Sequence, residues 1–90
     1  MLTTNLKMLA MTDSNYMTIE RRRAIMRSRA RSLRDEGYMT LYEVDNTQLF
    51  MTKLRHHHNG HTIIITAYPI RNIYTQVRDN KVIVDKMPIL

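Results

Sequence analysis

The stretch HHHNGHTIIITAY, residues 56–68, decides the fold that we expect for this chain. Asn59-Gly60 is the strongest turn signal in the sequence, since both residues tolerate the positive φ that a tight hairpin needs. The run HTIIITAY that follows is apolar on both faces, which favours a central or doubly covered strand over an edge strand. The sequence therefore predicts a hairpin whose second strand lies in the middle of a sheet.

Turn signals recur at regular intervals on both sides of this hairpin. Asp45-Asn46 and Asp79-Asn80 are weaker pairs of the same kind, and residues 69–72 form a further break. These breaks divide the chain after Gly37 into five expected strands, at residues 38–44, 47–57, 61–68, 73–78 and 81–86. Since such short connections force neighbouring strands to pair antiparallel, the prediction is a five-stranded antiparallel meander.

Before Gly37 the periodicity of the chain is helical, from residue 18 to residue 36. Thr18 is a suitable N-cap, and Gly37 stands where a left-handed C-cap residue belongs. At 100° per residue a narrow apolar stripe runs along this helix. The members of the stripe are Ile19, Met26, Ala30 and Leu33. One helix ahead of five strands predicts an α+β protein.

Residues 1–17 allow two interpretations. Leu2, Leu6 and Leu9 are spaced by four and three, which suits one or two turns of helix, whereas the polar residues 12–15 indicate a break. The sequence leaves this segment open between a short helix and a flexible arm.

Two packings of the helix and the strands are compatible with this order of elements. Either the helix lies across one face of a single sheet, or the sheet bends into a small barrel that resembles Sm-like and SH3-like folds. Gly37 and Gly60 are the only glycines, and this scarcity counts against the tight strand bending of a barrel. In outline the chain is also similar to toxin ribonucleases of the RelE and colicin type, which implies a twisted antiparallel sheet after the helix.

Length and composition predict one small domain. A chain of 90 residues buries only about 60 to 65% of the surface that its unfolded form exposes, so self-association would add useful burial. The lack of cysteine fits a reducing compartment, and no apolar run is long enough for a membrane span or a signal peptide. We therefore expect a soluble cytoplasmic protein with no membrane partner and no cofactor.

Seven of the ten arginines fall within residues 20–36, where three carboxylates leave a net charge of +4 out of +6 for the chain. On the helical wheel four of them form one basic ridge beside the apolar stripe. The ridge consists of Arg23, Arg27, Arg31 and Arg34. A basic helix favours a polyanion, and guanidinium groups grip phosphate in two places. The alternative interpretation is a solvated face that Glu20 partly balances.

Basic and aromatic residues also share faces of the predicted strands. The pairs are Tyr38 with Tyr42, Lys53 with Arg55, and Tyr74 with Arg78. Bases stack on tyrosine and phosphates pair with basic side chains, although tyrosines also serve as cross-strand packing residues. The complete set of candidate nucleic-acid-binding residues is Arg21, Arg22, Arg23, Arg27, Arg31, Arg34, Lys53, Arg55, Tyr68, Arg71, Tyr74 and Arg78.

Four histidines surround the Asn59-Gly60 turn, at positions 56, 57, 58 and 61. Imidazole ligates zinc, copper or nickel, but neighbouring residues of a strand point to opposite faces, and no carboxylate or thiol is close in sequence. We therefore expect no metal site. A metal-independent ribonuclease is a further alternative, since His, Tyr and Arg can supply its base, acid and cation. Its candidates are His58, His61, Tyr68, Arg71 and Tyr74.

These patterns favour a non-catalytic nucleic-acid-binding protein, with RNA or single-stranded DNA ahead of duplex. Four phosphate contacts to a single strand would give a log–log salt slope of roughly −3. A protein-binding regulator, such as a small viral or mobile-element protein that acts on a host machine, fits the same composition, because aromatic and arginine residues are enriched at protein interfaces. The sequence leaves both functions open.

Overall fold

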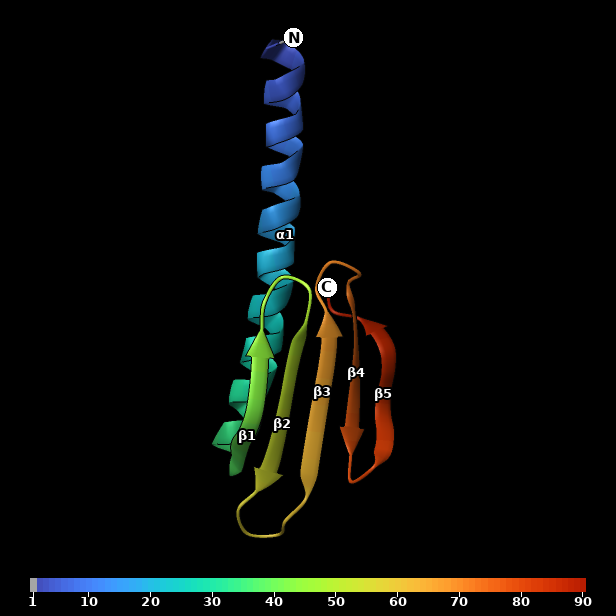
Figure 1. Ribbon diagram of the computed structural model, residues 1–90. Helices are drawn as coiled ribbons and strands as arrows, with labels where there is room; N and C mark the ends of the chain where they lie inside the picture. The colour runs from blue at the N-terminus through green and yellow to red at the C-terminus, as the bar shows by residue number, and fades with distance from the viewer. Residues whose placement is uncertain (1) are drawn as a thin grey trace.

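The computed structural model describes the backbone of residues 2–90 and the side chains of residues 15–90. One helix, α1 (Leu2–Asp35), precedes five strands: β1 (Tyr38–Asp45), β2 (Phe50–His56), β3 (Thr62–Tyr68), β4 (Ile73–Arg78) and β5 (Lys81–Pro88). The strands form one antiparallel sheet in the order β1-β2-β3-β4-β5 (Figure 1). The predicted α+β meander is confirmed. Because β1 and β5 do not pair, the sheet is open and the barrel alternative is wrong.

Helix α1 is longer than the sequence predicted. It runs without interruption through residues 12–15 and through Thr18, so both the expected break and the expected N-cap are wrong. Neither glycine nor proline occurs in this stretch, and polar residues alone lower helix propensity only slightly. The side chains of Leu2, Leu6 and Leu9 are not among those that the structure describes.

Only part of α1 lies along the sheet. A helix of 34 residues is about 50 Å long, whereas strands of six to eight residues span about 20 to 27 Å. Figure 1 shows the C-terminal part of α1 beside β1 and β2, and the rest of the helix extending past the strand ends. The helix therefore stabilises the sheet through its second half.

The core forms between this half of α1 and one face of the sheet. Met26 and Ala30 of the predicted stripe are completely buried, and Leu33 packs against them. Across from them Phe50 and Leu54 of β2 are also completely buried. Burial at alternate positions of β2 shows that one sheet face meets the helix, and we call it the helix face.

The opposite side of the sheet, here called the outer face, has no helix over it. Strand pairing aligns Tyr42, Lys53, Ile64, Val77 and Val82 in one row across all five strands. The second face of β3 is thus partly exposed, although β3 is the central strand, as predicted. The outer-face residues that the pairing assigns are Met39, Tyr42, Val44, Met51, Lys53, Arg55, Thr62, Ile64, Thr66, Tyr68, Ile73, Thr75, Val77, Val82 and Pro88. Asp85 and Lys86 lie opposite Thr75 in an irregular part of β5, and the pairing does not assign them to a face.

Both edge strands are irregular. In β1 the register shifts between Thr40 and Tyr42, which leaves Leu41 as an extra residue. In β5 the pairing passes from Val82 to Val84 over a single step of β4, so Ile83 is extra there, and from Val84 to Met87 over two steps of β4, so a second residue, at position 85 or 86, is extra as well. These are β-bulges, which bend an edge strand and increase its twist.

The turns follow the predicted positions with two changes in length. The connection between β1 and β2 spans residues 46–49 instead of 45–46, because β2 begins at Phe50 and not at the predicted residue 47. Asp79 and Asn80 both have positive φ, 49° and 66°, as expected for a two-residue hairpin turn. The hairpin between β2 and β3 is wider than predicted, because β2 ends at His56 and a five-residue loop, residues 57–61, precedes β3. Gly60 supplies the positive φ of that loop, 74°.

Gly37 ends the helix region with a φ of 107°, in agreement with the predicted C-cap. The N–H of Gly37 donates to the carbonyl oxygen of Arg34 at 3.0 Å, and its own carbonyl oxygen accepts from the N–H of His57 at 3.2 Å. The turn between α1 and β1 is thereby joined to the loop after β2. In the part of the chain that the structure describes, no helix is long and apolar enough to span a membrane.

Candidate functional site

Two arginines of the predicted ridge are paired with one carboxylate of the sheet. Arg23 Nε donates to Asp45 Oδ1 at 2.9 Å, and Arg27 Nη1 donates to Asp45 Oδ2 at 3.0 Å. Arg23 also pairs with Glu20 on the helix, as the sequence suggested. The Arg23 side chain is only 17% exposed. These guanidinium groups attach α1 to the end of β1.

The two arginines lower the pKa of the Asp45 carboxyl group. Burial acts to raise the pKa of its carboxyl group, but the hydrogen bonds from Arg27 and Arg23 and their positive charges outweigh burial. The net result is that the pKa of Asp45 lies below its ordinary value. The ionised form of Asp45 is therefore part of the folded structure.

The other two arginines of the ridge, Arg34 and Arg31, differ in their contacts. Arg34 Nη1 donates to Thr40 Oγ1 at 3.3 Å and lies 3.8 Å from Glu43 Oε1, so it too faces β1. Arg31 is exposed and makes no hydrogen bond or ion pair with any described residue. The ridge is therefore mostly a set of contacts between helix and sheet, with side chains that remain partly exposed, and it is not a continuous open basic surface.

Arginines on the other flank of α1 reach the turn between β3 and β4 and the helix face of β4. Arg22 Nη1 donates to the carbonyl oxygen of Pro69 at 2.8 Å. Arg29 Nη1 donates to Gln76 Oε1 at 3.2 Å, and its guanidinium carbon lies 4.9 Å from the centroid of the Tyr74 ring. Arg29 was absent from the predicted site. The arginine cluster thus holds the helix to the sheet from both sides.

The predicted strand residues separate onto two faces. Tyr38 and Tyr42 do not share a face as predicted, because the β1 bulge leaves Tyr38 on the helix face and Tyr42 on the outer face. Tyr74 and Arg78 lie on the helix face, because they pair with Ala67 and Ile63, which are buried there. With Arg29 over its ring and its side chain partly buried, Tyr74 is not open for stacking. Lys53 and Arg55 instead lie on the outer face, which the predicted pairs alone could not indicate.

The outer face carries unpaired cations and open aromatic rings. Lys53 and Arg55 are exposed and make no hydrogen bond or ion pair with the residues that the structure describes. Tyr42, directly across from Lys53, is 53% exposed, and Tyr68 is 39% exposed. On β1 to β4, none of the outer-face residues is acidic.

Arg71 extends the same surface at the end of β3. Its guanidinium carbon lies 5.7 Å from the centroid of the Tyr68 ring, a cation–π distance that leaves its N–H donors available. Because Tyr68 ends β3 and Arg55 lies opposite Thr62 at its start, the cations lie at both ends of the strand. The outer face therefore offers basic groups along about 20 Å of sheet.

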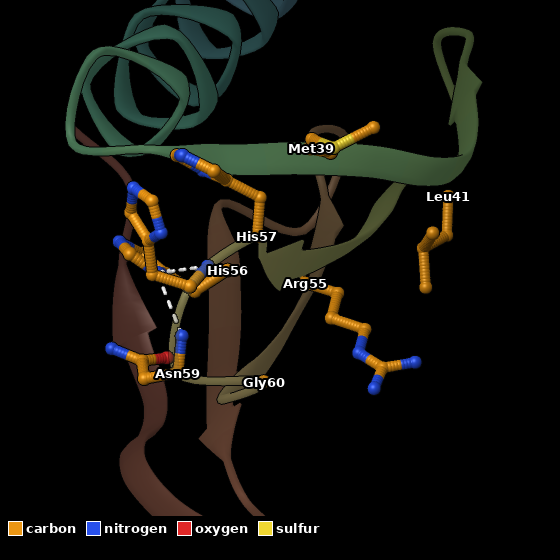
Figure 2. A pocket seen from close by; sticks show the side chains of 8 residues that line it. Met39, Leu41, Arg55, His56, His57, Asn59 and Gly60 are labelled. Atoms are coloured by element: carbon orange, nitrogen blue, oxygen red, sulfur yellow. Dashed lines mark hydrogen bonds between the residues drawn. The ribbon is translucent and has the colours of Figure 1, made fainter.

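A pocket of about 520 Å³ lies where the outer face meets the loop between β2 and β3. Figure 2 shows Arg55 and Leu41 on one side of it, with His56, His57 and Asn59 on the other. The residues around the pocket are Met39, Leu41, Arg55, His56, His57, His58, Asn59 and Gly60.

The histidines do not converge on one point. His56 Nδ1 accepts from the N–H groups of His58 and Asn59, at 3.2 and 3.3 Å, so its Nε2 carries the proton and donates to the carbonyl oxygen of Glu36 at 3.0 Å. His57 Nδ1 donates to the carbonyl oxygen of Gly37 at 2.6 Å. Among the described side chains, no group of three His, Cys, Asp or Glu residues is placed to hold a metal ion.

His61 lies apart from this pocket, against the turn between β4 and β5. Its Nδ1 lies 2.6 Å from Asp79 Oδ2, and Asp79 Oδ1 accepts from the N–H of Thr62 at 2.9 Å. The hydrogen bond from Thr62, together with His61, keeps the pKa of Asp79 below its usual value. The ribonuclease candidates are not brought together, since Tyr68 and Arg71 lie at the far end of β3 and Tyr74 on the helix face.

Comparisons with protein families, with curated proteins and with solved structures find no match for this chain.

Proposed function

We propose that this protein is a small, non-catalytic nucleic-acid-binding protein that holds a single strand of RNA or DNA on the outer face of its sheet. The observation that carries this proposal is the pair Lys53 and Arg55, which are exposed, have no partner among the described residues, and lie on a face without acidic residues on β1 to β4. An open sheet with cations and stacking rings is a common platform for single strands.

The roles follow from the positions of these residues. Lys53, Arg55 and Arg71 contact phosphates, while Tyr42 and Tyr68 offer ring surfaces on which bases stack. Arg21 and Arg31, exposed on the helix, add to the positive field that attracts the strand. Arg22, Arg23, Arg27, Arg34 and Tyr74 are assigned to packing instead, since each has a partner or cover within the fold.

The salt dependence of binding tests the number of phosphate contacts. Three contacts give a log–log slope of about −2 for a single strand, since each contributes about −0.7. We expect this slope from fluorescence anisotropy with a labelled oligonucleotide between about 50 and 200 mM salt, a fourfold range over which affinity should fall by roughly 16-fold. Binding that does not depend on salt, or no binding at 50 mM salt, would contradict the proposal.

A matched pair of charge reversals locates the contact. Lys53→Glu and Arg31→Glu both lower the net charge from +6 to +4, but only Lys53 lies on the outer face. We expect Lys53→Glu to weaken single-strand binding by about tenfold or more at low salt, and Arg31→Glu by less than about threefold. Equal losses would assign binding to the overall charge or to the helix rather than to the outer face.

A protein-binding regulator is a second candidate, favoured by the apolar side chains at both edges of the sheet. Met39 and Leu41 on β1, and Val82, Ile83 and Met87 on β5, are each more than half exposed. Such side chains are common at protein interfaces and at contacts between two copies of one chain. A pull-down of one defined host protein that survives nuclease treatment would favour this candidate. The cysteine-free composition suits the cytoplasm for either function.

A further inference from the structure

The pocket beside Arg55 is lined by imidazole and apolar side chains that the proposed single-strand binding along the sheet does not use. It lies at one end of the outer face, where the loop of residues 57–61 closes that face. Its volume of about 520 Å³ is within the range of small-molecule sites in proteins. A strand that runs along the outer face therefore meets the pocket at the end of its path.

The charged lining of the pocket is suited to an anion. None of the eight residues around the pocket is acidic. Arg55 Nη2 lies 3.8 Å from the position that a Cβ on Gly60 would occupy, so its guanidinium reaches the loop and stands in the pocket wall. A guanidinium group without an internal partner can donate two parallel hydrogen bonds to a phosphate.

Two of the imidazole rings add hydrogen-bonding capacity. His56 has both ring nitrogens engaged in the loop, so its role is structural. His57 uses only Nδ1, and no contact with the described residues engages the ring nitrogens of His58. The rings of His57 and His58 lie 3.9 Å apart between centroids. Three ring nitrogens remain for a ligand: in the neutral rings Nε2 of His57 is an acceptor, because Nδ1 carries the proton, and His58 supplies one N–H donor for an anion.

The remaining wall of the pocket is apolar. Met39 and Leu41 are 59% and 55% exposed, and Leu41 is the extra residue of the β1 bulge. Figure 2 shows its side chain pointing toward the same side as Arg55. A ligand that combines a phosphate with a sugar and a flat ring matches this combination of cationic and apolar walls, whereas a bare phosphate would leave Met39 and Leu41 without a contact.

We propose that this pocket binds the terminal nucleotide of the strand through a phosphate monoester, with the phosphate on Arg55 and an imidazole, and the nucleoside against Met39 and Leu41. This inference rests on the proposed function for the identity of the strand. A terminal monoester carries up to two negative charges and three terminal oxygens, whereas an internal phosphodiester carries one charge, so the pocket favours a phosphorylated end.

The first test compares oligonucleotides that differ only at their ends. Three eight-nucleotide strands of one sequence, each with the same internal fluorescent label, carry a 5′-phosphate, a 3′-phosphate, or hydroxyls at both ends. We expect one phosphorylated strand to bind at least about fivefold more tightly than the hydroxyl strand. Arg55→Gln and His58→Ala should each remove this ratio, whereas Arg71→Gln should weaken all three strands by a similar factor. Equal affinity for the three strands would overturn the inference.

A second test separates the pocket from the proposed function. Backbone amide shifts of residues 57–60 are followed by NMR while adenosine monophosphate, adenosine or inorganic phosphate is added to the full chain. We expect the monophosphate to shift these amides at lower concentration than the other two. If it does while no oligonucleotide binds, the pocket is supported and the proposed function fails. If oligonucleotides bind without end preference and the monophosphate shifts nothing there, the pocket inference fails alone. Equal responses to monophosphate and inorganic phosphate would overturn the nucleotide assignment.

Discussion

An Asp45→Asn variant is expected to melt about 10 °C below the unchanged protein. The substitution keeps the size of the side chain but removes the negative charge that accepts hydrogen bonds from Arg23 and Arg27. Hydrogen bonds to charged groups contribute about 1.5 to 3 kcal/mol each, and partial exposure reduces that value, so we expect a loss of about 2 kcal/mol. In a domain of this size each kcal/mol corresponds to about 4 to 8 °C.

Asp85→Asn is the matched control for this loss. Asp85 is exposed on β5 and makes no hydrogen bond or ion pair with a described residue, so the same chemical change should shift the melting temperature by less than about 3 °C. Thermal unfolding followed by circular dichroism measures both variants. If Asp45→Asn melts together with Asp85→Asn, then the arginines of α1 do not attach the helix to β1 in solution.

The same carboxylate makes stability depend on pH. Because the folded-state pKa of Asp45 is lowered, its ionisation stabilises the fold above the unfolded-state value of about 4, and this contribution is lost as pH falls through the folded-state pKa. We therefore expect the melting temperature to fall as pH drops below about 4, and to fall less in Asp45→Asn. Asp79, whose pKa is lowered too, leaves the variant with some of this dependence. A variant with an undiminished acid loss would exclude Asp45 as its source.

Gly37→Ala is expected to destabilise the protein by about 2 to 3 kcal/mol. Gly37 has a φ of 107°, a conformation that costs a residue with a Cβ about 1 to 3 kcal/mol. A Cβ at this position would also lie 2.8 Å from His56 Nε2, which donates the hydrogen bond to the carbonyl oxygen of Glu36. The substitution therefore combines backbone strain with displacement of a structural imidazole, and the midpoint of urea unfolding should fall markedly.

Gly60→Ala separates these two effects. Gly60 also has positive φ, 74°, but the nearest atom to a Cβ there is Arg55 Nη2 at 3.8 Å, an ordinary contact distance. We expect this variant to lose only the strain contribution, about 1 kcal/mol. If both glycine variants unfold at the same urea concentration, the close approach of His56 to Gly37 has no energetic consequence.

The fold was predictable where the signals are local. Turn pairs such as Asp79-Asn80 mark strand ends by their own backbone preferences, and a stripe such as Met26 and Ala30 marks the buried side of the helix. The start of α1 was not predictable in this way. Polar residues 12–15 weaken a helix without stopping it, and no proline or glycine marks its first turn.

The candidate site was predictable only in part, because the partners of its residues lie far away in sequence. Arg23 and Asp45 are 22 residues apart, and Arg29 and Gln76 are 47 apart, so charge composition could not show that these arginines contact the sheet. Alternation did place Lys53 with Arg55 on one face. The packing of Met26 and Ala30 determines which face of the sheet the helix covers. Tyr74 lies on that covered face, whereas Lys53 and Arg55 lie on the other.

The extra residues Leu41 and Ile83 interrupt the two strands whose outward backbone groups would otherwise be available to another chain. An open sheet with aliphatic side chains on its edge strands can pair edge to edge with further copies and form fibrils. A bulged edge strand does not present its N–H and C=O groups at the regular spacing that pairing with another strand requires. The bulges of β1 and β5 therefore let the chain display Met39, Val82 and Met87 to solvent while disfavouring polymerisation.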